Sequence, residues 1–193
     1  SIPVCIQYGL PPAFIPFISD TVVYFPRAIC FISIFSETLH QFLAGNWQTI
    51  KPLNTELIEH NLQIGEVYWA SLNMHWHGLH TLYRGELETP RAIVARLAQI
   101  ADVYDHDFAL LLKFLLNTSL LLASRQLPEA LAETEAGLDF AQKHNFRLAL
   151  IHLCGCQALI RILMDQDEVA EQAVAQADII RREMDTVPWQ LSL

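Results

Sequence analysis

Three histidines lie within six residues of one another in the stretch NMHWHGLHTLYRGE, residues 73–86, and they could bind a metal ion: His75, His77 and His80. A zinc site needs three or four ligands that converge on one point. On a helix, His75 and His77 would project about 200° apart, and only His77 and His80 can lie side by side. The other histidines are scattered and supply no obvious third ligand: His60, His106, His144 and His152. We therefore predict structural roles for the cluster, with no metal and no cofactor.

The four cysteines are Cys5, Cys30, Cys154 and Cys156. Only one residue separates the last two, whereas zinc knuckles and redox pairs usually have two residues between their cysteines. Free cysteines are often buried as small apolar side chains. We expect free thiols and a reducing, cytoplasmic setting.

Other catalytic patterns are absent from the sequence. It contains no GxxxxGK[ST] loop for nucleotide phosphates, no GxSxG elbow and no kinase motif. Several carboxylates fall in predicted helices, where we expect a solvated outer face: Glu129, Glu133, Glu135, Asp139, Glu168 and Glu171. The sequence therefore favours a protein without enzymatic activity.

Composition predicts a folded chain. Apolar residues make up 52% of the 193 residues and charged residues 17%, which excludes a disordered segment and fits one domain. The net charge of −9 and the lack of long basic runs argue against nucleic acid as a partner. Residues 1–35 are strongly apolar, but prolines and charged residues interrupt every window long enough to span a membrane. We expect no membrane contact, and a fragment cut from a longer protein.

Two sets of turn-forming residues recur every 40 positions. The first set is Gly45, Gly85, Arg125 and Asp165, and the second is Gly65, Asp105 and Asn145. Each lies in a short polar stretch between segments whose apolar residues recur at helical spacing. The two sets predict four first helices at 26–44, 66–84, 106–124 and 146–164, and four second helices at 47–64, 87–104, 127–144 and 167–184.

One position of each predicted first helix carries a small or short side chain. It is occupied by Thr38, Gly78, Thr118 and Ala158, and the residue four positions earlier is apolar. Twelve positions after this slot the second helix has Pro90, Ala130 and Ala170 in successive repeats. Small residues at both positions would allow the two helices of a hairpin to approach closely.

This pattern resembles the tetratricopeptide-repeat family, although its period of 40 exceeds the usual 34. The resemblance implies an all-α fold: a right-handed superhelix of about four antiparallel helical hairpins. The predicted single domain, 1–193, comprises an N-terminal helical segment, 1–25, and repeats at 26–65, 66–105, 106–145 and 146–185. Long-period versions of this repeat occur in sensor segments of large bacterial signalling proteins, which combine an ATPase with a cyclase, kinase or transcription-regulator output. Residues 26–50 and 82–101 resemble that group.

Polar residues along the first helices form the predicted recognition stripe: Asn73, His77, Arg84, Lys113, Asn117, Gln157 and Arg161. Its cations could hold an acidic peptide or carboxylate by charge-assisted hydrogen bonds, or these side chains could merely solvate one face or bridge adjacent helices. Apolar residues interleave with the stripe and predict self-association or contact with adjoining domains of the parent chain: Phe35, Leu39, Phe42, Leu79, Leu82, Leu115, Leu122, Leu159 and Ile162.

The sequence thus predicts a protein-interaction or sensory scaffold within a larger cytoplasmic signalling regulator. The alternative is a small-molecule sensor with a pocket near His75, Trp76 and His80, where aromatic rings are dense.

Overall fold

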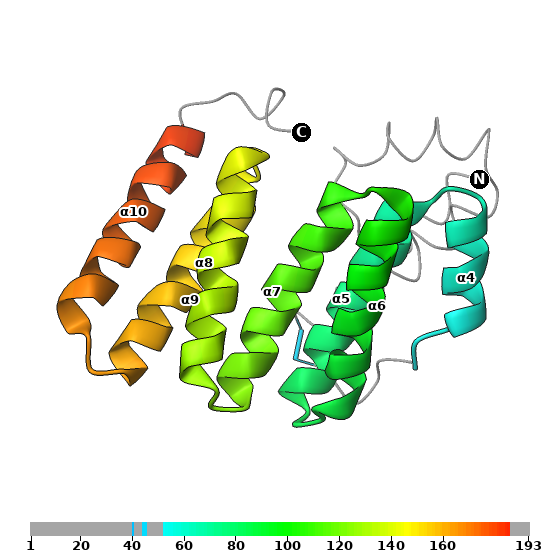
Figure 1. The fold of residues 1–193 in the computed structure, drawn as a ribbon, viewed down its shortest axis with the longest axis horizontal. Helices are drawn as coiled ribbons and strands as arrows, with labels where there is room; N and C mark the ends of the chain where they lie inside the picture. The colour runs from blue at the N-terminus through cyan, green and yellow to red at the C-terminus, as the bar shows by residue number, and fades with distance from the viewer. Residues whose placement is uncertain (1–39, 41–43, 46–51, 186–193) are drawn as a thin grey trace. The chain divides into compact units, whose positions relative to one another are not determined.

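The computed structural model describes residues 40, 44–45 and 52–185. The chain divides into two compact units, 1–51 and 52–193. The described residues of the second unit form seven helices and no strand, so the predicted all-α class is confirmed for them. Consecutive helices run in opposite directions (Figure 1).

The helices are α4 (Thr55–Gln63), α5 (Val67–Tyr83), α6 (Glu88–Tyr104), α7 (Asp107–Ala123), α8 (Leu127–Lys143), α9 (Arg147–Leu163) and α10 (Asp167–Asp185). Helices α5 to α10 agree with the predicted ranges to within one residue at each end. The predicted segment 1–25 and nearly all of the helix 26–44 lie outside the described residues. We call α5, α7 and α9 the first helices, and α4, α6, α8 and α10 the second helices.

The predicted helix 47–64 begins too early. Residues 52–54 are not helical, and α4 starts only at Thr55. Asn54 caps this helix, because its side-chain oxygen accepts a hydrogen bond from the Leu57 amide at 3.0 Å. This local signal overrides the repeat period at this one boundary.

Every helix from α4 to α9 is followed by a residue with left-handed backbone. The described residues with positive φ are Gly45, Gly65, Gly85, Asp105, Arg125, Asn145 and Asp165, spaced by 20 throughout. Six of them are followed by a residue whose amide donates back to a carbonyl five positions earlier, as in Glu86 to Thr81 at 3.0 Å and Gln126 to Leu121 at 3.0 Å. This bond closes a Schellman motif, which satisfies carbonyls at the helix end and turns the chain back.

The first helices also pack against one another. Helix α7 contacts α5 and α9 as well as its neighbours in sequence, α6 and α8. The cluster between α7, α8 and α9 contains the buried residues Leu111, Ala141, Ala149 and Leu153. Aromatic rings continue the contact, since Tyr68 stacks on Phe108 with ring centroids 4.4 Å apart.

The small slot lies in these contacts. Thr118 and Ala158 are buried, and a Cβ on Gly78 would come within 2.6 Å of Leu116 Cδ2. The matching positions in the second helices are buried as well: Pro90, Ala130 and Ala170. Within hairpins, Thr118 lies 3.4 Å from Thr134 on α8, and Ala158 packs with Ala170 and Ala173 on α10. The small slot therefore lies at close contacts between helices.

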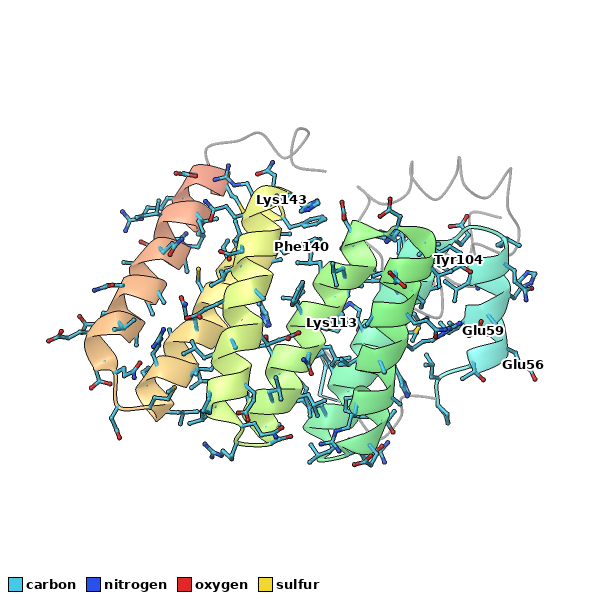
Figure 2. The ribbon with its side chains drawn as sticks, viewed as in Figure 1. Glu56, Glu59, Tyr104, Lys113, Phe140 and Lys143 are labelled. Carbon is cyan, nitrogen blue, oxygen red and sulfur yellow. The ribbon has the colours of Figure 1, made fainter. Side chains whose placement is uncertain are left out.

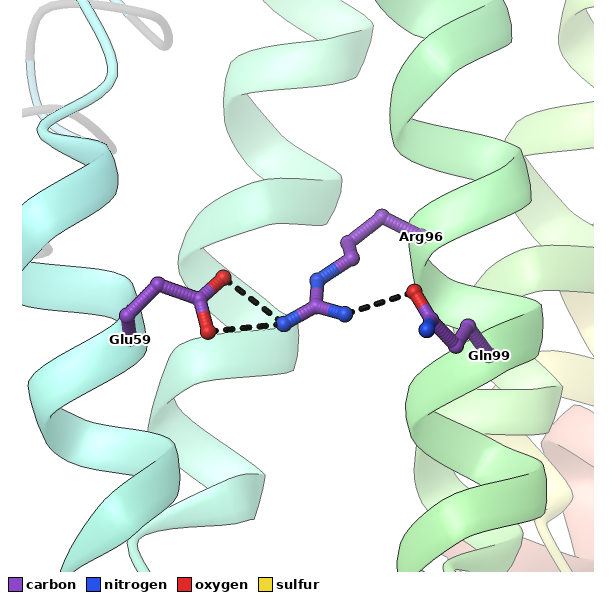
Figure 3. Close-up of polar contacts among 3 residues, drawn as sticks. All are labelled: Glu59, Arg96 and Gln99. Carbon is purple, nitrogen blue, oxygen red and sulfur yellow. Dashed lines mark hydrogen bonds and ion pairs between the residues drawn. The ribbon is translucent and has the colours of Figure 1, made fainter.

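Polar contacts tie second helices together at the surface. One nitrogen of Arg96 on α6 donates to both carboxylate oxygens of Glu59 on α4, at 2.7 and 2.8 Å, and the other donates to Gln99 at 2.6 Å (Figure 3). Both charged side chains are substantially solvent-exposed, so we assign this pair less than about 1 kcal/mol of stability.

Two glycines in first helices should respond in opposite ways to alanine. Gly78→Ala forces Leu116 to move and should lower the free energy of unfolding by about 1–3 kcal/mol. Gly155→Ala meets no atom within 4 Å and should raise it by about 0.5–1 kcal/mol, because alanine is the better helix former. Urea unfolding followed by circular dichroism measures both, and equal effects would contradict the packing described.

The turns provide a second matched pair. Gly85→Ala should lower the unfolding free energy by about 1 kcal/mol, since φ is 84° and no neighbour would clash with the new methyl group. Arg125→Gly, at φ 59°, should relieve a similar backbone strain and so stabilise the folded state. The extra entropy that glycine gives the unfolded chain should offset part of this gain. Thermal melting compares the two variants, and stabilisation by Gly85→Ala would be incompatible with a left-handed turn.

Candidate functional site

The predicted polar stripe does not lie on one exposed surface. Asn73 and His77 are buried, Asn117 and Gln157 are half-buried, and among these seven residues only Arg84 is exposed. The side chains of Lys113 and Arg161 are each 20% exposed. The stripe therefore offers a partner little continuous polar area.

Each cation of the stripe is paired within the chain. Lys113 Nζ on α7 lies 2.6 Å from a carboxylate oxygen of Glu133 on α8, and Figure 2 shows Lys113 between these two helices. Arg161 on α9 donates to Glu135 on α8 at 3.0 Å and to Gln166 at 2.6 Å. Arg84 lies 3.5 Å from Glu86. Lys113 and Arg161 thus bridge neighbouring helices, whereas Arg84 pairs within the turn between α5 and α6.

The predicted solvated outer face is wrong for one of its six carboxylates. Five of the six predicted outer-face carboxylates are exposed: Glu129, Glu135, Asp139, Glu168 and Glu171. Glu133 is not, because its side chain packs toward Lys113 and is only 16% exposed. A half-buried ion pair of this kind joins a first helix to a second helix rather than facing solvent.

The interleaved apolar residues of the first helices differ in exposure, and Leu115 also packs against the core cluster of α7, α8 and α9. We call six of them the apolar face: Leu79 and Leu82 on α5, Leu115 and Leu122 on α7, and Leu159 and Ile162 on α9. Those on α5 and α7 are half-buried, whereas Leu159 is 49% and Ile162 52% exposed. Tyr83 and Leu163 lie next to this set in sequence and are also exposed. The other predicted members, Phe35, Leu39 and Phe42, lie outside the described residues.

Exposure differs at one repeated position of the first helices. Leu82, Leu122 and Ile162 occupy this position at intervals of 40 residues, and Ile162 is the most exposed of the three. Helix α7, which carries Leu122, contacts both α5 and α9.

The histidine cluster is part of the packing. His75 is buried, and its Nδ1 lies 3.2 Å from the carbonyl oxygen of Leu112 on α7. Burial lowers its pKa from 6.5 to about 4. Burial, followed by the nearby His80, also lowers the pKa of His77. Within residues 52–184 we find no group of three or more histidine, cysteine or acidic side chains placed to hold a metal ion.

The alternative pocket was predicted around His75, Trp76 and His80. His75 and His80 are buried and Trp76 is half-buried, so all three rings lie within or beside the helix packing. The rings of His75 and Trp76 meet edge to face, with centroids 5.9 Å apart.

One pair of potentially reactive side chains was not predicted from the sequence. Sγ of Cys156 lies 3.6 Å from Nε2 of His152, one turn earlier on α9. The spacing of four residues was the available signal, because such residues share a helix face. Burial raises the pKa of Cys156 to about 11, so this thiol is protonated near neutral pH and is a poor nucleophile on its own.

Comparisons with known proteins give no match: no family model, no curated protein and no solved structure is significantly similar to the chain. None of the helices in the part that the structure describes has the length and apolar character needed to cross a bilayer.

His75 should make stability depend on pH. Its folded-state pKa lies below the ordinary 6.5, so between about pH 4 and 6.5 the unfolded chain binds more protons. Stability should therefore fall as the pH is lowered through this window, and His75→Leu should weaken that dependence. Urea unfolding at several pH values measures it.

The control for His75→Leu is Trp76→Leu, which changes packing at the next residue without removing a titratable group. It should lower stability by a similar amount at every pH tested. If His75→Leu left the pH dependence unchanged, His75 would not be the neutral buried group that the structure indicates.

Proposed function

We propose that the chain is a non-catalytic protein-interaction or sensory scaffold within a larger cytoplasmic signalling regulator. In this proposal the helical hairpins continue as a right-handed superhelix similar to tetratricopeptide repeats, and its partner is a protein. Support comes from α5 to α9, which all have 17 residues and are joined by equivalent turns, as in repeat proteins.

The observation that carries the proposal is the apolar face. Large apolar side chains lie on successive first helices, recur at one position as Leu82, Leu122 and Ile162, and are about half exposed at Leu159 and Ile162 on α9. Neighbouring exposed apolar side chains are typical of interaction surfaces. The cations of the polar stripe, in contrast, already have carboxylate partners in the chain.

Recognition through this surface would therefore rest on apolar burial rather than on charge. Removing one leucine or isoleucine side chain from water contributes about 1.5–3 kcal/mol when burial is complete. Two such side chains on α9 suffice for an affinity difference of about a hundredfold. A partner segment with apolar side chains on one side fits this surface better than an acidic peptide.

Photo-crosslinking in cells that express the parent protein tests the proposal. A photoreactive amino acid at Leu159 or Ile162 should crosslink to one defined protein, or to another domain of the parent protein. Val103 on α6 and Ile179 on α10 are matched controls, since they are 66% and 58% exposed but lie on second helices. Crosslinks of equal yield at all four positions, or at none, would refute the proposal.

Substitutions then test whether the partner binds the apolar face or the polar stripe. Leu159→Asp combined with Ile162→Asp should reduce recovery of the crosslinked partner by more than about tenfold, because charge opposes apolar burial. Val103→Asp with Ile179→Asp should leave recovery unchanged. Arg84→Ala with Arg161→Ala should also leave recovery unchanged. Reduced recovery in this variant would assign partner binding to the polar stripe.

A further inference from the structure

His152 and Cys156 are not part of the apolar face, so the proposed protein interaction gives them no role. Both project from α9, His152 exposed and Cys156 half-buried, with Nε2 and Sγ 3.6 Å apart. Imidazole nitrogen and thiolate sulfur are the two ligand types that zinc binds best in structural sites. The spacing of four residues is the one that places both histidines of an HExxH motif on a single zinc ion.

The distance between the two atoms fits one edge of a zinc tetrahedron. With a Zn–S bond of about 2.3 Å and a Zn–N bond of about 2.0–2.1 Å at the tetrahedral angle, sulfur and nitrogen lie about 3.6 Å apart. The pair therefore needs little rearrangement to bind as two ligands of one ion. The described residues contain no group of three suitable side chains, so further ligands must come from elsewhere.

The surroundings of the pair allow a second helix to approach. Gly155 lies on the same side of α9, and a Cβ there would meet nothing within 4 Å. Leu148 and Leu159 flank the pair in sequence and are 74% and 49% exposed. This part of α9 is open, apolar and uncharged apart from His152, which suits contact with an identical surface.

We propose that His152 and Cys156 form half of a tetrahedral zinc site, which the same pair in a second copy of the chain completes. A twofold axis places identical residues of both copies on either side of it, so two pairs give the closed set of two cysteines and two histidines. One zinc ion would then join two chains through α9.

Zinc binds thiolate sulfur and neutral imidazole nitrogen. The Zn–S bond therefore forms as the thiol of Cys156 loses its proton to solvent. Each zinc ion should thus release two protons, one from each cysteine.

Sedimentation velocity of the full 193-residue chain tests the site, with zinc chloride added at half a molar equivalent. The expected result is a doubling of mass at one zinc per two chains. Cobalt(II) in place of zinc should give a charge-transfer absorption band that reports thiolate ligation. Both signals should be lost in Cys156→Ser and in His152→Ala, which leave the helix intact by circular dichroism.

Cys154→Ala is the matched control, because this cysteine is two residues away and fully buried. It should retain the zinc-dependent doubling of mass. Three results would overturn the proposal: no mass change with zinc, binding of one zinc per chain without dimerisation, or a dimer that survives both substitutions. Retention of the cobalt band in Cys156→Ser would assign the sulfur ligand to another cysteine and overturn it as well.

Discussion

The backbone hydrogen bond that closes each turn sets the geometry of residues 52–185. A donor five residues after its acceptor, with a left-handed residue just before the donor, ends α4 to α9 at intervals of 20 residues. Because the ends recur so regularly, α5 to α9 are all 17 residues long. Equal helices bring equivalent side chains to equivalent heights, so one face can repeat along the array.

Much of this geometry could be predicted because its causes are local in sequence. The left-handed positions carry Gly, Asp or Asn everywhere except at Arg125, and the slot at Gly78, Thr118 and Ala158 marks the close contact. A period read from these residues placed the helices to within one residue. It failed at α4, where the cap at Asn54 acts on that helix alone and has no counterpart in the repeat.

The candidate site was harder to predict, because a period assigns residues to equivalent positions but does not say which neighbour each one meets. Lys113 and Arg161 are charged and lie on first helices, as a recognition stripe would require. Their partners, Glu133 and Glu135, lie 20 and 26 residues away on α8, at positions that looked solvent-facing. Only the packing of helices shows that these charges neutralise each other.

The two surfaces on α9 overlap, and this overlap has a physical consequence. Leu159 belongs to the apolar face and also flanks the pair formed by His152 and Cys156. If a second copy covered α9 through a zinc ion, a partner that docks on Leu159 would compete with it. Anything that binds one state and not the other shifts the equilibrium by its differential affinity. Zinc and the protein partner would then be mutually exclusive ligands of one helix, and each would weaken the apparent binding of the other by the same factor.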